Sequence, residues 1–191
     1  MRDAFIALGH DAMSCDLIDT ETPGPHYKGS VFDVIDYPWD IGIFHFPCTQ
    51  TAVSGSKHFA AKWMDGRQAA GVSLFMHGWR RAQHIPRVAF EHPVSILSSL
   101  FRKPDQIVQP HNFGHPEFKA ICWWLRDLPA LKPTEQLHIP ERGTEEWKAW
   151  NKVHRAPPGV DRWKDRSRSY PGMCKAIAWQ WGGPIALERA A

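Results

Sequence analysis

A thiol and a carboxylate stand at the ends of two apolar runs, and these side chains are the best candidates for chemistry in the sequence. Cys48 follows the run at residues 40–46, directly after Pro47. Glu91 ends the run that begins at residue 87. Both runs carry the β-branched and aromatic residues of buried strands, and proline marks where such a strand stops. Ligands bind beyond the carboxyl ends of strands in open α/β sheets, so we expect the thiol and the acid to share one sheet edge.

The sequence also allows a purely structural role for Cys48 and Glu91. Cysteines after strands are often buried and inert, and acids at strand ends often cap helices. The catalytic interpretation makes Cys48 a nucleophile and Glu91 an acid. Covalent catalysis by a thiol requires local activation of the thiolate.

The composition predicts one globular domain over residues 1–191, with 43% apolar residues and a core of ordinary size. The formal net charge is +3, which permits nucleic-acid binding without demanding it. Four cysteines occur without a close pair or a zinc-ligand spacing, which predicts reduced thiols in a cytoplasm and no metal site. No leader pattern and no apolar run of membrane-spanning length is present, so we expect no membrane partner.

Basic and aromatic side chains cluster near the end of the chain. This cluster consists of Arg155, Arg162, Trp163, Lys164, Arg166, Arg168 and Tyr170. Such a cluster is either a solvated face or a surface that contacts phosphate groups and stacks on bases. The second interpretation makes Arg155, Arg162, Lys164 and Trp163 candidate nucleic-acid-binding residues.

The elements that must position these residues alternate along the first half of the chain. The patterns predict a helix over 2–8, a strand over 12–17, a loop over 21–29 and a short helix over 31–35. The strand before Cys48, a polar loop over 54–58, a helix over 66–84 and the strand before Glu91 follow. This order predicts an α/β fold with parallel strands and right-handed crossovers.

The second half of the chain predicts an antiparallel hairpin at the edge of the mostly parallel sheet. Its strands are expected over 107–113 and 120–125, joined by residues 114–117. Prolines and charges make residues 129–165 irregular, with one short helix over 145–151. A final helix is expected over 170–181.

Together these motifs resemble the cytosine-5 DNA methyltransferases, and most of all the short methyltransferase-like proteins of bacteriophages and prophages. Phe46-Pro47-Cys48-Thr49 is similar to the family's Pro-Pro-Cys motif, and Phe90-Glu91-His92-Pro93 to its Glu-Asn-Val or Glu-Asn-Pro motif. The resemblance to the phage group runs from about residue 2 to residue 181 and includes residues 104–106, 113–119 and 166–169. It implies an incomplete Rossmann-like methyltransferase fold in the cytoplasm of a bacterial host.

The resemblance also implies the catalytic roles. In the family, a cysteine thiolate adds to carbon 6 of a flipped cytosine, and carbon 5 then attacks the methyl group of S-adenosylmethionine. A glutamate holds or protonates ring nitrogen 3. By resemblance Cys48 is the nucleophile and Glu91 the acid, while Arg168 and Arg166 match the arginine motif that holds the cytosine or its phosphate. A surface ion pair is the alternative for both arginines.

S-adenosylmethionine is the implied cofactor, with Asp16, Ser30, Phe46 and Pro47 as its contacts. Asp16 falls near the family's ribose-binding acid, and Ser30 stands where the family has an acid that reads the adenine amino group. Residues 1–5 match the helix that follows the family's Phe-x-Gly-x-Gly loop, so the given sequence has no counterpart of the loop whose backbone donors hold the cofactor.

Two functions are expected from these features. The first is methyl transfer to cytosine in DNA. The second is a protein on the same scaffold that has lost the cofactor and binds DNA or a protein partner as a regulator or inhibitor. A missing first strand would leave a sheet edge that a partner subunit could cover. Different chemistry that uses the same thiol addition to a pyrimidine is a third possibility.

Overall fold

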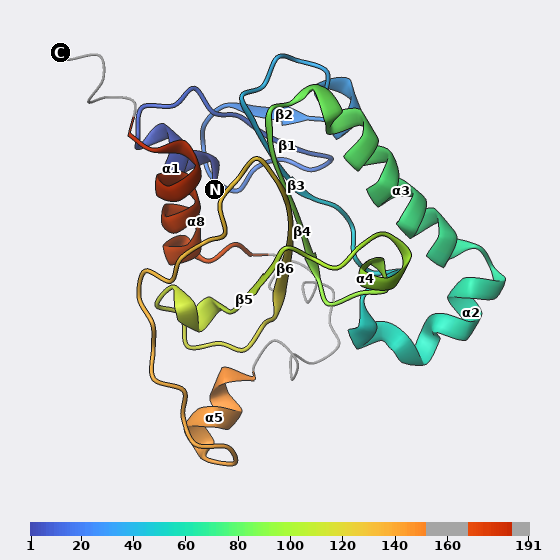
Figure 1. Cartoon of the computed structure of the whole chain (residues 1–191), viewed down its shortest axis with the longest axis vertical. Coiled ribbons are helices and arrows are strands. Elements are labelled where there is room, and N and C mark those ends of the chain that lie inside the picture. The colour runs from blue at the N-terminus through green and yellow to red at the C-terminus, as the bar shows by residue number, and fades with distance from the viewer. Residues whose placement is uncertain (152–167, 185–191) are drawn as a thin grey trace. The chain divides into compact units, whose positions relative to one another are not determined.

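The computed structural model describes residues 1–151 and 168–184, and the chain divides into two compact units (Figure 1). Unit 1 comprises Met1–Ala12, Val108–Ala120 and Leu131–Ala191, and unit 2 comprises Met13–Ile107 and Ile121–Ala130. The single domain expected from the sequence stays a prediction. Unit 2 contains both Cys48 and Glu91.

The fold is mixed α/β, and its larger sheet has the strand order β3-β4-β6-β5. The strands are β3 (Ile41–His45), β4 (Arg87–Pro93), β6 (Ile121–Arg126) and β5 (Gln106–Val108). Strands β3 and β4 are parallel, whereas β6 runs antiparallel to β4. The two strands that the apolar runs predicted are therefore neighbours, and β3 lies at an edge of the sheet.

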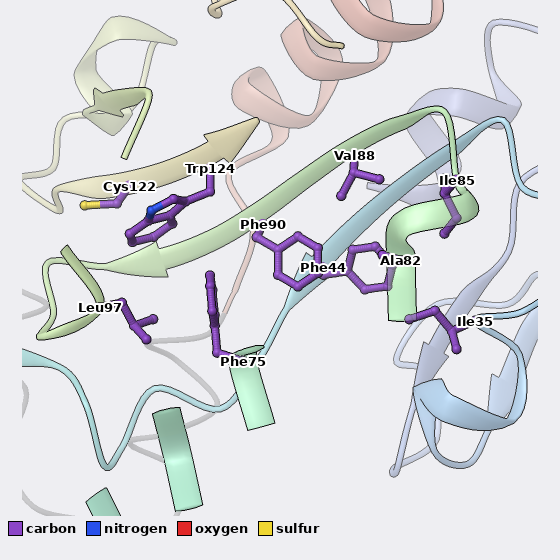
Figure 2. Close-up of a cluster of buried hydrophobic side chains, with 10 residues drawn as sticks. All are labelled: Ile35, Phe44, Phe75, Ala82, Ile85, Val88, Phe90, Leu97, Cys122 and Trp124. Atoms are coloured by element: carbon purple, nitrogen blue, oxygen red, sulfur yellow. The ribbon is translucent and has the colours of Figure 1, made fainter. Parts of the chain in front are cut away.

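Helix α3 (Arg67–Arg81) covers one face of this sheet and forms the main core of unit 2 with it. Figure 2 shows Phe75 of this helix pointing toward Phe90 and Trp124 of the sheet. The ring of Phe75 meets both rings edge-on, at centroid distances of 5.3 Å and 5.4 Å. The helical apolar pattern over 66–84 is confirmed, and η3 (Ala82–His84) ends that segment. Burying these large rings supplies the main hydrophobic stabilisation of the sheet.

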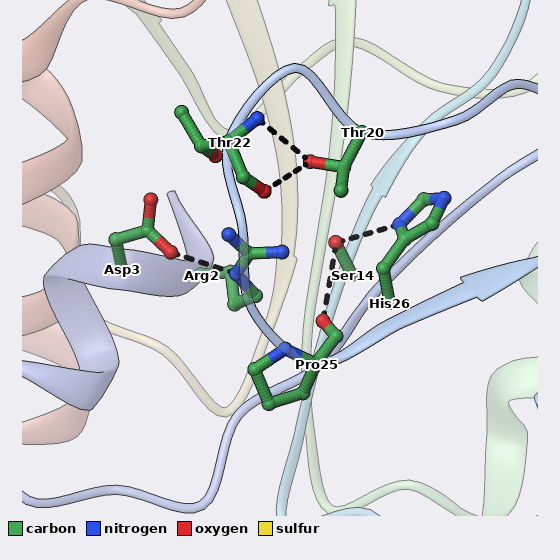
Figure 3. A network of polar contacts seen from close by, with 7 residues as sticks. All are labelled: Arg2, Asp3, Ser14, Thr20, Thr22, Pro25 and His26. Atoms are coloured by element: carbon green, nitrogen blue, oxygen red, sulfur yellow. Dashed lines mark hydrogen bonds and ion pairs between the residues drawn. The ribbon is translucent and has the colours of Figure 1, made fainter.

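A second, two-stranded sheet holds the first predicted strand. Strand β1 (Ser14–Asp16) pairs in parallel with β2 (His26–Lys28), and neither strand joins the larger sheet. The prediction of an uninterrupted loop over 21–29 is wrong, because β2 lies within it. Figure 3 shows the Ser14 hydroxyl between the Pro25 carbonyl and His26, whose Nδ1 lies 2.9 Å away. These polar contacts join the two strands, and β2 is too short and too exposed to carry an apolar pattern of its own.

The segment after β3 is more ordered than the sequence predicted. Residues 54–58, expected as a polar loop, lie in the 3-10 helix η2 (Val53–His58), which leads into α2 (Phe59–Met64). Gly66 then adopts a φ of 79°, a left-handed conformation that glycine accepts without a steric penalty, and α3 begins at the next residue. The short helix expected over 31–35 is present as η1 (Val31–Asp33), and a further short helix, α4 (Leu97–Leu100), follows β4.

The prediction of a tight hairpin at the sheet edge is wrong, because the connection between its two strands is longer than expected. Strand β5 ends at Val108, and Pro110 begins the 3-10 helix η4 (Pro110–Asn112) instead of continuing the strand. Proline has no amide hydrogen for a sheet ladder, and the Gln109 amide donates to Asn112 Oδ1 at 2.8 Å. The connection to β6 therefore spans residues 109–120 and is no tight turn.

Within the described residues, unit 1 contains the helices α1 (Arg2–Ile6), α5 (Glu145–Trp150) and α8 (Pro171–Ile177), the 3-10 helix η4 and the π-helix η5 (Ala178–Gly182). Helix α1 contacts α8 and η5, and His10 Nε2 lies 2.7 Å from the Gly183 carbonyl oxygen. The helices predicted near the start, near residue 145 and over 170–181 are confirmed.

None of the helices in the described residues combines the length and apolar character needed to cross a bilayer. No disulfide joins the four cysteines, all of which lie in the described part of the chain.

Candidate functional site

Cys48 lies three residues beyond the end of β3 and begins a tight turn. The amides of Thr51 and Ala52 both donate to its carbonyl oxygen, at 3.1 Å and 2.9 Å. The cysteine is half-buried, unlike Cys122 and Cys174, which are buried. A turn immediately after the strand thus holds the Cys48 backbone where the sequence placed the candidate nucleophile.

A buried threonine and histidine fasten this turn to β4. The Thr51 hydroxyl donates to the Cys48 carbonyl oxygen at 3.3 Å and lies 2.7 Å from His92 Nε2. Thr51 and His92 are each 1% exposed. Because the single hydroxyl proton goes to the cysteine carbonyl, His92 Nε2–H donates to Thr51 Oγ1 in this arrangement. His92 follows Glu91 directly, so one contact links the cysteine turn to the residue beside the acid.

Backbone hydrogen bonds tie the same two segments together. The Val53 amide donates to the Val94 carbonyl at 3.0 Å, and the Ile96 amide donates to the Thr51 carbonyl at 3.1 Å. Ala52 and Ser95 form an antiparallel bridge between these bonds. The chain after Cys48 therefore runs alongside the chain after Glu91, and backbone pairing sets the relative position of the two segments.

Glu91 is partly buried and contacts a histidine on the neighbouring strand. The parallel register pairs Glu91 with His45, and His45 Nδ1 lies 3.2 Å from Glu91 Oε2. The side chain of Glu91 is 19% exposed and that of His45 is 44% exposed. On the other side, Glu91 is in register with Trp123, whose ring meets the His45 ring edge-on at 6.1 Å. Strands β3, β4 and β6 thus bring an imidazole, a carboxyl group and an indole together.

Burial shifts the pKa values of two groups around this site. It lowers the pKa of His92 to about 4, because a charged imidazole would lose its hydration, and the nearby Glu91 carboxylate only partly opposes this. His92 is therefore neutral at pH 7. Burial, with a smaller contribution from Glu91, raises the pKa of the Cys122 thiol to about 11. Cys122 is a packing residue with almost no thiolate at neutral pH.

A lysine and a hollow lie next to the cysteine turn. Lys62 of α2 is buried, and its ammonium group donates to the Thr49 carbonyl oxygen. The hollow has a volume of about 240 Å³ and is lined by Pro47, Gln50, Arg67, Ala70, Gly71 and Leu74. Gln50 Oε1 is buried and has no hydrogen-bond partner within the described residues. The residues on both sides of Cys48 therefore border open space.

The four residues predicted to bind the cofactor make local contacts. Asp16 ends the separate sheet and accepts the Ile18 amide at 3.4 Å, and Ser30 caps η1 by accepting the Phe32 amide at 3.2 Å. Phe46 stacks nearly parallel to Phe44 at 6.2 Å. Pro47 lines the hollow. The binding of S-adenosylmethionine by these four residues stays a prediction.

The predicted nucleic-acid contacts lie elsewhere in the chain. Arg168 is exposed and belongs to unit 1. Arg155, Arg162, Trp163, Lys164 and Arg166 lie outside the described residues, so their predicted roles stay predictions.

Three residues of the site were missed from the sequence. His45, Thr51 and His92 join the strands and the turn through side chains, and no local pattern distinguishes them from ordinary strand and loop residues. One signal was present for His45. His45 precedes Pro47 by two positions, just as Glu91 precedes Pro93 by two positions. Aligning the two strands at their prolines therefore pairs His45 with Glu91.

Among the described residues, no group of three or more histidine, cysteine or acidic side chains could hold a metal ion. Comparison of the chain with models of known families, with curated proteins and with solved structures finds no match.

Proposed function

We propose that this protein adds the Cys48 thiolate to carbon 6 of cytosine in DNA, with Glu91 as the acid at ring nitrogen 3. It would thus act in the manner of the cytosine-5 DNA methyltransferases, on an incomplete Rossmann-like scaffold. The carrying observation is the parallel pairing of β3 with β4, which sets the strand leading to Cys48 beside the strand holding Glu91.

The chemistry needs both groups. When Sγ bonds to carbon 6, the carbon 5–carbon 6 double bond is lost and negative charge moves into the ring. A proton passed from the Glu91 carboxyl group to nitrogen 3 neutralises that charge, and carbon 5 becomes enamine-like. Carbon 5 then takes up an electrophile. A solvent base removes the hydrogen of carbon 5 as the thiolate leaves carbon 6, which restores the double bond, and nitrogen 3 returns its proton to Glu91. S-adenosylmethionine would supply the methyl group when bound.

Three features support this proposal. Cys48 is half-buried in a turn held by backbone and by Thr51, as a positioned nucleophile must be. Glu91 is 19% exposed and contacts His45 of the neighbouring strand, so its carboxyl group is held in a defined place. The hollow beside Pro47 provides space next to the turn. A base reaching this site must leave the DNA stack, which implies a flipped nucleotide.

A second function is favoured by the contacts of Asp16 and Ser30. The Ser30 oxygen is engaged in helix capping, and Asp16 belongs to a sheet separate from that of Cys48. These observations favour a protein that has lost the methyl donor and binds DNA or a protein partner as a regulator. Binding of DNA that survives Cys48→Ala, together with no measurable binding of S-adenosylmethionine, is the result that this alternative predicts.

The deciding experiment measures the thiol addition without a methyl donor. An enamine-like carbon 5 exchanges its hydrogen with solvent, so a deoxycytidine oligonucleotide tritiated at carbon 5 should release tritium in the presence of the protein. Cys48→Ser should abolish the release, because serine is a far weaker nucleophile. Cys15→Ser is the matched control, since Cys15 is another half-buried thiol of unit 2.

Methyl transfer and calorimetry with S-adenosylmethionine complete the experiment. Exchange with transfer supports a methyltransferase, and exchange without transfer supports the same thiol chemistry with another electrophile. If the wild-type protein releases no tritium from any cytosine oligonucleotide, the proposed chemistry is wrong and the binding alternative remains.

A further inference from the structure

We infer that the segment around helix α2 is a DNA-binding surface, on which the Trp63 ring stacks against an unpaired base and Lys57 meets a phosphate of the same strand. The inference rests on the proposed function, which brings a DNA strand to Cys48. Neither Trp63 nor Lys57 takes part in the thiol chemistry, so the surface and the chemistry can be tested apart.

Helix α2 exposes two large apolar side chains to solvent. Trp63 is 68% exposed and Met64 is 84% exposed. Residues three and four positions apart are neighbours on a helix, and the residue at these distances before Trp63 and Met64 is the small, exposed Ala60. No bulky side chain of α2 therefore covers this face of the helix. Large apolar side chains that gather in the open beside a candidate site mark an interaction surface.

A buried lysine fastens this helix to the cysteine turn. Lys62 is 6% exposed, and its ammonium group donates to the carbonyl oxygen of Thr49, the residue after Cys48. A Cβ atom at Gly55 would lie 3.5 Å from Lys62 Nζ, so η2 also packs against the ammonium group. Successive side chains of a helix point about 100° apart, so Trp63 faces solvent while Lys62 faces the turn. The exposed ring is thus held at a fixed place next to the candidate nucleophile.

The charges of the segment favour a polyanion as the partner. Residues 53–67 carry the cationic side chains Lys57, Lys62 and Arg67 and a single acid, Asp65. Arg67 pairs with Asp65, so this acid does not neutralise the exposed Lys57. A second copy of the same surface would set like charges against each other, which disfavours self-association. DNA attracts the cations through its phosphates and offers the ring a base on which to stack.

The ring requires a base with an open face. Bases of an intact duplex are stacked on both sides, whereas a strand that yields its cytosine to Cys48 is locally unpaired. Stacking on aromatic side chains accepts any base, because every base has a π-face. The surface should therefore bind unpaired DNA beside the target without reading its sequence.

The test measures the affinity for a fluorescent single-stranded oligonucleotide by anisotropy, in a Cys48→Ser background that forms no covalent adduct. Trp63→Ala should bind about 5- to 150-fold more weakly, the contribution of one stacked base, and Trp63→Phe should recover most of that loss because it keeps a ring. Lys57→Gln should reduce the slope of log affinity against log salt by about 0.7, the value for one phosphate of a single strand. Trp179→Ala is the matched control, since Trp179 is 59% exposed but lies in unit 1.

Unchanged affinity in Trp63→Ala, equal weakening by Trp63→Ala and Trp179→Ala, or no DNA binding at all would overturn the inference. So would sedimentation that shows Trp63→Ala to lose self-association while its DNA affinity is unchanged, because the occupant would then be a second copy. The tritium-release assay separates the surface from the proposed function. Binding that depends on Trp63, in a protein with Cys48 that releases no tritium, contradicts the chemistry and keeps the surface. Tritium release and DNA affinity at wild-type levels in Trp63→Ala contradict the surface and keep the chemistry.

Discussion

At the scale of single residues, the site depends on polar side chains that are buried and must be satisfied. Thr51 donates to the Cys48 carbonyl oxygen and contacts His92, which has no hydrogen-bond partner at Nδ1 within the described residues. A buried nitrogen without a hydrogen-bond partner lowers the free energy of unfolding, and a second proton on the ring would lower it further. This destabilising nitrogen lies where the turn that carries the candidate nucleophile is fixed to the strand that carries the candidate acid.

His92 should make the protein sensitive to acid. Its pKa is lowered from 6.5 to about 4 by burial, so the unfolded chain takes up the proton first as the pH falls. The stability that depends on neutral His92 is complete above pH 6.5 and is lost as the pH falls toward 4. The loss should reach about 2–3 kcal/mol near pH 4.5. Urea unfolding of His92→Asn, which cannot be protonated, should show a pH dependence weaker by that amount.

The control for this prediction is His84→Asn. His84 is exposed at the end of the segment that contains α3, and its replacement should leave the acid dependence as in the wild-type protein. Equal pH dependence in the wild-type protein and in His92→Asn would show that another group controls acid unfolding.

The two kinds of cysteine should react differently with alkylating reagents. Cys122 is 3% exposed, and burial raises its pKa to about 11, so its thiolate is scarce at pH 7.5. We expect iodoacetamide to modify Cys48 in the folded protein and to modify Cys122 only after unfolding. Peptide mass spectrometry with and without denaturant measures both. Modification of Cys122 at the rate of Cys48 in the folded protein contradicts this prediction.

At the scale of elements, the close approach of α3 to β3 positions the segment that leads to Cys48. Phe46 stacks on Phe44 and on Phe90, the latter at 5.6 Å, and its ring lies against Gly78 of α3. A Cβ atom at Gly78 would lie 2.3 Å from Phe46 Cζ. The helix can approach this closely only because residue 78 has no side chain.

Gly78→Ala should therefore destabilise the protein although alanine is the better helix former. The propensity gain is about 1 kcal/mol, whereas overpacking costs about 1–3 kcal/mol and the stacked rings restrict how far Phe46 can shift. We expect the free energy of unfolding in urea to fall by up to about 2 kcal/mol, and tritium to be released from cytosine more slowly. Ser73→Ala, at an exposed position of the same helix, should not destabilise the protein. Equal stability of both variants would show that the ring moves freely.

At the scale of the whole molecule, the net charge of +3 is small, so DNA binding would depend on local clusters of basic residues. The predicted cluster includes Arg155, Arg162 and Lys164, which lie outside the described residues. Each phosphate contact adds to the salt dependence of binding, whatever the base sequence. The proposed function requires DNA affinity, and so does the form of the alternative in which the protein binds DNA as a regulator. The salt dependence of DNA binding therefore tests a property that these two share.

Replacing Arg155, Arg162 and Lys164 together by glutamine should reduce the slope of log affinity against log salt by about 2–3, since each phosphate contact contributes about 0.9. Fluorescence anisotropy with a labelled oligonucleotide between 50 and 200 mM salt, the range over which such contacts change affinity most, measures the slope. The control replaces Lys103, Lys132 and Arg142 by glutamine, which removes the same amount of positive charge. These three residues are exposed in the described part of the chain. Equal slopes for the two triple variants would assign the effect to net charge rather than to the cluster.

The sequence by itself determined the elements with strong local patterns. Apolar runs that end near prolines predicted β3 and β4, and the helical period predicted α3. Cys48 follows β3 as predicted, whereas Glu91 lies within β4, two residues before its end. These predictions succeeded because burial of one face imposes a period on the residues and because proline cannot continue a sheet ladder.

Only the tertiary structure decided which strands pair and in what register. The pattern over residues 12–17 predicted β1 but not its partner, because the pairing of β1 with β2 in a separate sheet depends on backbone and hydroxyl contacts between the two strands. The register that sets His45 against Glu91, and the buried contact of Thr51 with His92, likewise join residues more than forty positions apart. Local residue types constrain a backbone segment, but long-range hydrogen bonding selects its partner, and that selection gave Glu91 its histidine.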